Sequence, residues 1–209
     1  LHLHFHCIIV EYKKVSYPSH LDLSRPESLG LYATRNFVIK YEDSDKNSVS
    51  IAAWHVLPNK LVKRFHKHLL IDAETLKNIS NDANYNENNL VSNNSYKVVE
   101  ALVGSNFDVH NISQRDFFYE ELLRKTKDPV VLYLHGNTGS RANGHRMELY
   151  KTLRKLGYHV IAIDFRGFAD SSDHMPTEKG CVLDSLAAYI YVKNLTNNPL
   201  YVYGHSLGR

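Results

Sequence analysis

"LYVYGHSLG", residues 200–208, joins an apolar run directly to a Gly-x-Ser-x-Gly motif. The run predicts a short buried strand, because valine and tyrosine favour extended backbone. After a strand, this motif is typical of a sharp strand-to-helix turn that exposes the serine, here Ser206. Gly204 and Gly208 then omit side chains that would clash within the turn. The motif alone is common by chance, so its meaning depends on the elements that precede it.

Two further apolar runs precede this one along the chain. "VVLYLHG" covers residues 130–136 and "YHVIAIDFRG" covers residues 158–167, and both are typical of strands buried on two faces. Helical patterns follow each of these strands, at residues 145–157 and 181–195. The alternation of strand and helix predicts an α/β protein with a mostly parallel sheet and right-handed crossover connections.

Each helical pattern predicts an apolar stripe that packs on the sheet. In the first, Gly157 is expected as the C-terminal cap, and the stripe comprises Met147, Tyr150 and Leu153. In the second, the spacing i, i+3, i+4, i+7 predicts a buried stripe of Leu183, Leu186, Ala187 and Ile190.

The N-terminal half is less regular. Residues 36–58 predict two strands joined by a polar turn and closed by Pro58, and residues 115–129 predict an amphipathic helix that stops at Pro129. Residues 76–96 are crowded with asparagine, which predicts a low-complexity insertion without fixed structure.

Bulk composition is that of a globular protein, with 43% hydrophobic and 22% charged residues. A net charge of +3 over 209 residues gives no reason to expect nucleic-acid binding. Two cysteines, Cys7 and Cys181, cannot form a disulfide framework. The sequence has no initiating methionine, no signal peptide and no apolar stretch long enough to span a membrane. We therefore expect a piece of a longer protein.

No cofactor or metal is expected. His2, His4 and His6 would share one face of a strand and could bind a metal, but an ordinary edge strand or a terminal stretch is the favoured interpretation. "GNTGSR" lacks the Gly-Lys-Ser/Thr ending of a phosphate-binding loop. No Gly-x-Gly-x-x-Gly opens any predicted helix, so nucleotide binding is disfavoured.

A serine nucleophile needs an oxyanion site as well as a base. The backbone N–H of Leu207, directly after Ser206, is one expected oxyanion donor. The second is expected from the loop after an earlier strand, and the N–H of Asn137 in the His135-Gly136-Asn137 segment is our choice. Together these residues predict an acyl-transfer site.

Other polar residues near the expected site have more than one interpretation. Asp164 and Arg166 follow a strand and could contact substrate, but such a pair more often braces its loop. His135 and His205 are interpreted as packing or turn-bracing residues rather than as bases, and Asp184 as a structural or solvated carboxylate.

These motifs, in this order, resemble the α/β-hydrolase family. The similarity is strongest to family members that act on lysophospholipids and monoacylglycerols. It extends from residue 17 to residue 208 apart from the asparagine-rich stretch, and it rests on "DLSRPESLGL", "VSIAAWHVLP", "LYLHGNTGSR", "HRMELYKTLRKLGYHVIAIDFRG" and "NPLYVYGHSLG". The fold implied is an α/β-hydrolase domain cut after the strand that carries Ser206. Residues 1–35 would form an N-terminal juxtamembrane segment, and residues 36–209 the N-terminal part of that domain.

The resemblance also implies an activity and a location. Such enzymes hydrolyse the acyl ester of lysophosphatidylserine and of monoacylglycerols, with Ser206 as nucleophile and no cofactor. They are held in the endoplasmic reticulum membrane by an N-terminal helix, which would precede this chain, and their catalytic domain is lumenal. Four glycosylation sequons suit a lumenal domain, at Asn78, Asn93, Asn111 and Asn194. Oligomeric state is left open.

In this fold the three residues of the catalytic triad follow one another along the sequence in the order nucleophile, acidic residue, histidine. Only three residues follow Ser206 in the sequence, so the 209-residue piece is expected to be inactive while its parent is a serine lipase. Two alternatives stay open. One is a non-catalytic relative that binds a lipid or a protein partner, and the other is a peptidase or small-ester hydrolase of the same fold.

Overall fold

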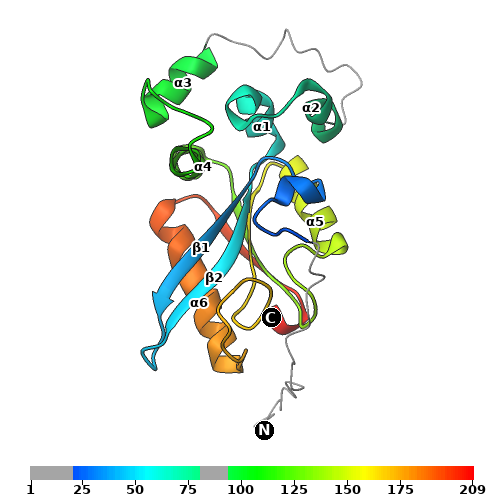
Figure 1. Cartoon of the computed structure of the whole chain (residues 1–209), viewed down its shortest axis with the longest axis vertical. Helices are drawn as coiled ribbons and strands as arrows, with labels where there is room; N and C mark the ends of the chain where they lie inside the picture. Colours follow the sequence, from blue (N-terminus) through cyan, green and yellow to red (C-terminus); the bar gives the residue numbers. More distant parts are fainter. Residues whose placement is uncertain (1–20, 81–93) are drawn as a thin grey trace.

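The computed structural model describes residues 21–80 and 94–209, and its centre is one five-stranded sheet (Figure 1). The strand order is β1-β2-β4-β3-β5. Strands β3, β4 and β5 run parallel, whereas β2 is antiparallel to both β1 and β4. This mixed, mostly parallel arrangement confirms the expected fold class. The bounds are β1 Thr34–Glu42, β2 Ser48–Val56, β3 Val130–Leu134, β4 His159–Ile163 and β5 Leu200–Gly204.

The parallel strands end at one edge of the sheet. Leu134 at the end of β3 is in register with Ile163 of β4 and with Gly204 of β5. The loops that follow these three strands therefore start side by side. Every residue of β3 and β4 is buried, as the continuous apolar runs predict.

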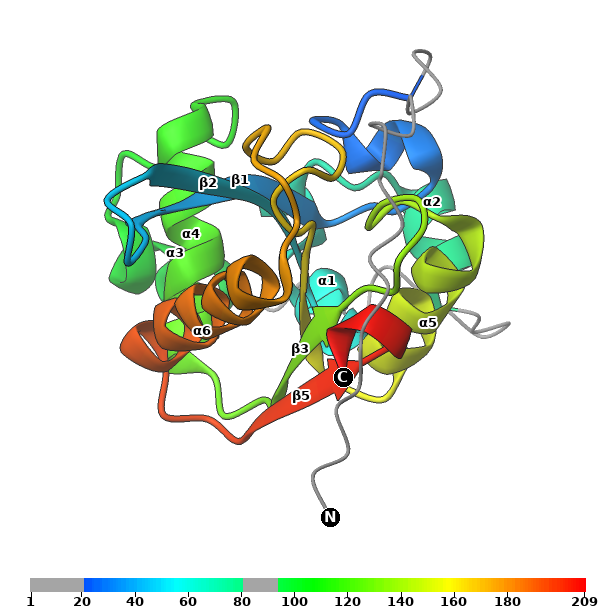
Figure 2. The same ribbon diagram turned by 90° about the horizontal axis from the view of Figure 1, so that it is seen from below.

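Two helices cover opposite faces of the sheet (Figure 2). Helix α5 (Gly144–Lys155) packs Tyr150 against Trp54 and Tyr133 on one face. Helix α6 (Glu178–Leu195) buries Ala188 and Val192 on the other face, which it shares with α4 (Ile112–Lys125). The apolar stripe expected for α5 is present, and Gly157 follows the helix with φ +91°.

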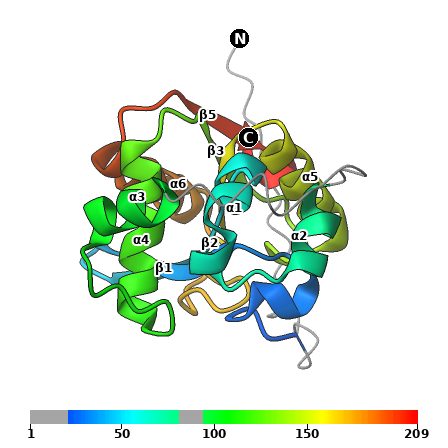
Figure 3. The same ribbon diagram turned by 90° about the horizontal axis from the view of Figure 1, so that it is seen from above.

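Four helices cluster at the end of the sheet opposite the C-terminus (Figures 1 and 3). They are α4 together with α1 Asn59–Phe65, α2 Ala73–Ser80 and α3 Asn94–Val103. Both ends of the stretch 76–96 are helical, so the lack of fixed structure expected for it is wrong at residues 76–80 and 94–96, and residues 81–93 lie outside the described ranges. Leu76 is fully buried in this helical cluster and Ile79 packs against it, so apolar contacts hold the α2 end of the asparagine-rich stretch.

The domain also begins earlier than residue 36. Leu31 is buried in the core, and the carbonyl oxygen of Leu23 accepts a hydrogen bond of 2.9 Å from the Trp54 indole. Residues 21–35 thus pack on the same sheet rather than forming a separate segment. The three N-terminal histidines and Cys7 lie outside the described residues. Within the described ranges, no helix has the length and apolarity to cross a bilayer, and no three metal-binding side chains converge.

The apolar stripe expected to be buried on α6 is wrong in part, because Ala187 packs against the core as expected but Leu186 and Ile190 do not. The residues that face the sheet are Gly180, Cys181, Asp184, Ala188 and Val192. Leu186 and Ile190, placed in the core by the sequence pattern, are 49% and 47% exposed. Apolar residues surround this helix, so periodicity alone does not select one face. The buried carboxylate of Asp184 selects it instead, through its ion pair with Arg166.

Two buried histidines join β2 to β4 far from the elbow. His55 Nε2 lies 2.9 Å from His159 Nδ1, and His159 Nε2 lies 3.1 Å from Thr126 Oγ1. Burial lowers the pKa of His159 to about 3 and moves the pKa of His55 well below its usual value. Protonating either imidazole would place a positive charge in the core, away from water, and this costs free energy.

We expect this pair to make folding stability depend on pH. Below about pH 6.5 these histidines bind protons in the unfolded chain but not in the folded chain. The free energy of unfolding is therefore highest above that pH and decreases as the pH falls toward 3. The expected loss between pH 7.5 and pH 5 is about 2 kcal/mol for His159, and the lowered pKa of His55 acts in the same direction. Urea unfolding at both pH values measures it. His159→Gln should flatten the dependence, and His110→Gln, at an exposed position, should not. Equal slopes in all three proteins would contradict the assignment.

Candidate active site

Ser206 lies on a sharp bend at the end of β5. The N–H of His205 donates to the Leu134 carbonyl at 3.0 Å, so pairing with β3 continues to the residue before the serine. The chain then turns, with Ser206 at φ +54° in the left-handed region and a single 3-10 turn over Ser206–Gly208. Few non-glycine residues adopt this φ, and strain of this kind is found at nucleophile elbows. The Ser206 side chain is exposed.

Both glycines of the motif are required by close backbone contacts. A Cβ on Gly204 would overlap the carbonyl oxygen of Gly208. A Cβ on Gly208 would overlap the carbonyl oxygen of Leu134, at the end of β3. The backbone of the bend therefore packs closely on itself and on the end of β3.

Gly208→Ala is expected to displace the bend. If Ser206 is the acyl-transfer nucleophile that the sequence predicts, ester hydrolysis by the full-length protein should fall about 100-fold, since misplacement by about 1 Å costs that much. Gly144→Ala is the matched control, because a Cβ at Gly144 meets open space. Initial rates and far-UV circular dichroism of both variants measure the effect. Unchanged activity in a folded Gly208→Ala protein would show that the close contact is not needed.

The loop between β3 and α5 touches the elbow. It contains the segment from which the second oxyanion donor is predicted. A Cβ on Gly136 would lie 3.0 Å from Nδ1 and 3.2 Å from the carbonyl oxygen of His205. A side chain at position 136 would force the two turns apart by a few tenths of an ångström. The structure thus brings the segment 135–137 and the elbow together.

The orientation of the Gly136–Asn137 peptide leaves the Asn137 N–H without a hydrogen-bond acceptor among the described residues. The Gly136 carbonyl accepts hydrogen bonds from His135 Nδ1 at 2.7 Å and from Arg146 Nη2 at 3.3 Å. The peptide is trans, so the N–H of Asn137 points the opposite way. Within the described residues, neither this N–H nor that of Leu207 donates a hydrogen bond. Both are therefore free to bind an oxyanion, although their roles stay a prediction.

His135 is a brace and not a base. It is fully buried, and its Nε2 accepts a hydrogen bond of 3.1 Å from the N–H of Phe165. Nε2 therefore carries no proton, and Nδ1 donates to the Gly136 carbonyl. Burial lowers the pKa of His135, which keeps this neutral tautomer. His205 is exposed at the elbow, with its backbone in the strand ladder and its ring against Gly136.

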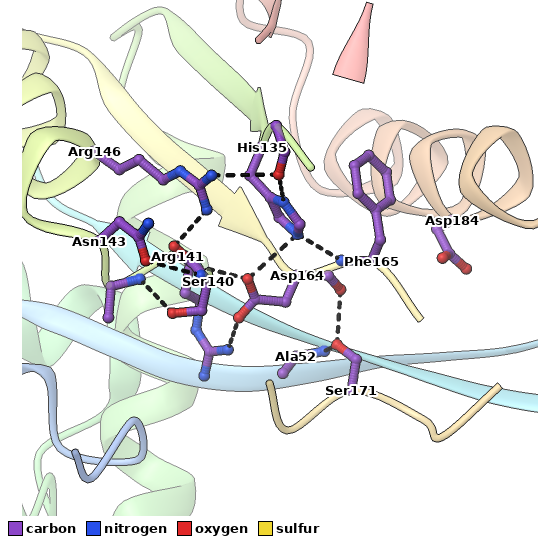
Figure 4. Close-up of polar contacts among 12 residues, drawn as sticks. Ala52, His135, Ser140, Arg141, Asn143, Arg146, Asp164, Phe165, Ser171 and Asp184 are labelled. Atoms are coloured by element: carbon purple, nitrogen blue, oxygen red, sulfur yellow. Dashed lines mark hydrogen bonds and ion pairs between the residues drawn. The ribbon is translucent and has the colours of Figure 1, made fainter. Parts of the chain in front are cut away.

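Asp164 ties two of the loops together (Figure 4). Its carboxylate accepts a 2.6 Å hydrogen bond from the N–H of Arg141 and an ion pair from the Arg141 guanidinium. Its Oδ1 lies 3.4 Å from His135 Nε2, and Asp164, Arg141 and His135 are all fully buried. Asp164 therefore braces the loop after β4 against the loop after β3.

Arg166 is a brace for a different part of the fold. Its backbone N–H donates to Asp184 Oδ2 at 2.8 Å, and its guanidinium binds Asp184 and Asp43 at 3.0 Å and 3.1 Å. Asp164 and Arg166 thus both act as braces, as the sequence favoured, but each has its own partners. Asp184 is structural and buried rather than solvated.

Sequence reasoning missed two buried arginines of the site, Arg141 and Arg146. Both are essentially inaccessible to solvent, at 0% and 1% exposed. A signal was present at Arg146. It lies in the first turn of α5, where the helix dipole disfavours a cation. An arginine at this position therefore indicates a role other than stabilising the helix.

A family model for the alpha/beta hydrolase fold matches residues 129–208, which contain the last three strands and the elbow. This part of the chain is thus similar to the α/β-hydrolase fold, in agreement with the mostly parallel sheet and the elbow described above. Lysophosphatidylserine lipase ABHD12 of Xenopus tropicalis is 35% identical over 93% of the chain and 37% of its own length. The protein of the same name from Gallus gallus is 32% identical over 93% of the chain and 38% of its own length.

Two further matches are shorter or weaker. Protein ABHD12B of Homo sapiens is 41% identical over 44% of the chain and 25% of its own length. An esterase of Pyrococcus furiosus aligns with a TM-score of 0.45 and 19% identity, over 94% of the chain and 48% of that protein. The chain spans little more than a third of the first curated relatives, 37% and 38% of their lengths.

Proposed function

We propose that the whole protein is a serine hydrolase that cleaves the acyl ester of lysophosphatidylserine and of monoacylglycerols. One observation carries the catalytic part of the proposal. Ser206 is exposed at φ +54° on a strand-to-turn bend, and the loop that offers the free Asn137 N–H lies against that bend. The substrate class is supported by relatives named lysophosphatidylserine lipase at 35% and 32% identity over 93% of the chain.

The proposed mechanism is acyl transfer in two steps. Ser206 Oγ attacks the ester carbonyl while a histidine takes its proton, and the oxyanion is held by the N–H groups of Asn137 and Leu207. The histidine returns the proton to the departing alcohol, and water then hydrolyses the acyl-enzyme. Because the chain order in this fold is serine, acid, histidine, we place the acid and the histidine after residue 209 of the whole protein.

We also propose a location in the endoplasmic reticulum membrane, with the catalytic domain in the lumen and an N-terminal anchor before this chain. Of the four sequons, Asn194 lies exposed near the end of α6, where a glycan would meet solvent. We expect the gel mobility of the protein to shift after glycosidase treatment, and this shift would support the location. Protease sensitivity of the domain in intact microsomes would contradict it.

The full-length protein in detergent micelles tests the function. We expect release of fatty acid from both lysophosphatidylserine and a monoacylglycerol, with Ser206 labelled by a fluorophosphonate probe. Labelling of Ser206 with hydrolysis of short esters or peptides alone would replace the lipase proposal with a small-ester hydrolase or peptidase. Absence of both labelling and hydrolysis would favour a non-catalytic binding protein.

A further inference from the structure

Arg146 occupies an unfavourable place for a cation. It is 1% exposed, in the first turn of α5, where the positive end of the helix dipole repels a guanidinium. Within the described part of the chain, no carboxylate lies close enough to form an ion pair with it. A buried, uncompensated cation costs free energy, so some other set of contacts must hold it.

The carbonyl groups that accept hydrogen bonds from Arg146 all come from the loop between β3 and α5, and the Tyr133 side chain on β3 also interacts with the guanidinium. Nη1 donates to the Ser140 carbonyl at 2.6 Å. Nη2 donates to the Thr138 carbonyl at 2.6 Å and to the Gly136 carbonyl at 3.3 Å. Figure 4 shows the guanidinium of Arg146 directed toward Ser140 and the turn beside His135. One rigid planar fork thus fixes three carbonyls within five residues, and a lysine has no such geometry.

One of these carbonyls belongs to the peptide that offers the Asn137 N–H. Holding the Gly136 oxygen from one side fixes the direction of that N–H on the other side. Hydrogen bonds to a peptide oxygen also polarise the peptide, which strengthens its N–H as a donor. A cation has this effect more strongly than a neutral donor. The His135 imidazole binds the same oxygen, at 2.7 Å, and supports the same orientation.

We infer that Arg146 is a positioning residue, which orients and polarises the Gly136–Asn137 peptide as an oxyanion donor. The inference rests on the proposed function. Its effect belongs to the transition state, where negative charge develops on the substrate oxygen, and not to ground-state substrate binding. Arg146 itself is separated from the substrate by the peptide it holds.

Arg146→Lys and Arg146→Met in the full-length protein test this inference. Arg154→Met is the matched control, because Arg154 lies on the same helix, is 3% exposed, and donates to the Tyr32 carbonyl away from the elbow. We expect kcat per folded molecule to fall about 10-fold for Arg146→Lys and about 100-fold for Arg146→Met, with KM changed less than about threefold. Arg154→Met should keep kcat within about twofold.

A second readout separates positioning from stability. A trifluoromethyl ketone forms an oxyanion on Ser206, so its affinity should fall by the same factor as kcat/KM in the Arg146 variants. Folded Arg146 variants with wild-type kcat and inhibitor affinity would overturn the inference. Failure of both variants to fold, beside a folded Arg154→Met, would assign Arg146 to stability and overturn it too. Wild-type hydrolysis with labelled Ser206 keeps the proposed function intact in either case.

Discussion

Ser206→Ala in the full-length protein is expected to lower kcat for ester hydrolysis by about 10⁵- to 10⁶-fold, the range seen when a catalytic-triad serine is removed. The reason is that the acyl-enzyme cannot form, so only the oxyanion site and substrate binding still assist water. The fold should survive, because the hydroxyl is exposed and alanine keeps the backbone hydrogen bonds of the turn. Steady-state rates and labelling by a fluorophosphonate probe measure the loss.

Ser185→Ala provides the control for the serine variant. Ser185 lies on α6, and its hydroxyl donates to the Cys181 carbonyl at 2.8 Å, a local helix contact away from the elbow. Its loss should leave the rate within about twofold of wild type, since a hydrogen bond of this kind contributes little to the site. If Ser206→Ala kept a tenth or more of the wild-type rate, Ser206 would not be the nucleophile.

Asp164→Ala is expected to destabilise the protein by about 3 to 5 kcal/mol, the cost of breaking a buried ion pair by removing one partner. The substitution leaves the Arg141 guanidinium buried without its fully buried carboxylate. The remaining partner, Asp170, is 43% exposed at its side chain and cannot replace that interaction in the core. The loss should appear as a lower midpoint of urea unfolding, measured by fluorescence on the full-length protein.

A surface ion pair supplies the comparison. Lys179 and Asp45 are paired at 3.1 Å with side chains 61% and 64% exposed. Asp45→Ala should therefore leave the unfolding midpoint nearly unchanged. The double variant Arg141→Met/Asp164→Leu should lose less than Asp164→Ala, since no charge is left alone in the core. Equal losses for Asp164→Ala and Asp45→Ala would mean that the buried pair does not brace the loops.

The sequence predicted the C-terminal half of the fold well. Continuous apolar runs mark β3 and β4 because strands buried on both faces need no polar residues. The run at 200–204 also forms a strand, but the buried environment predicted for it is wrong, because β5 lies at the edge of the sheet with its three central residues exposed. The helix α5 follows from a clear stripe, and the bend at Ser206 follows from glycines that its backbone contacts require. Local signals suffice wherever the local pattern and the tertiary environment agree.

Where tertiary contacts decide, the sequence was a poor guide. The face of α6 is set by the ion pair of Asp184 with Arg166, which no period-3.6 pattern contains. The helices α2 and α3 enter an asparagine-rich stretch because Leu76 and Val99 are buried against α4 and its neighbours. Arg141 and Arg146 are charged residues in a core, and their partners are backbone groups and carboxylates brought together only by folding.

A crystal structure of the full-length protein with a phosphonate bound to it measures the central claim most directly. The account predicts a covalent bond from Ser206 Oγ to phosphorus, with one phosphonyl oxygen about 2.7 to 3.1 Å from the N–H nitrogens of both Asn137 and Leu207. A phosphonate on another residue, or one on Ser206 whose oxygens face solvent away from those two amides, would contradict it.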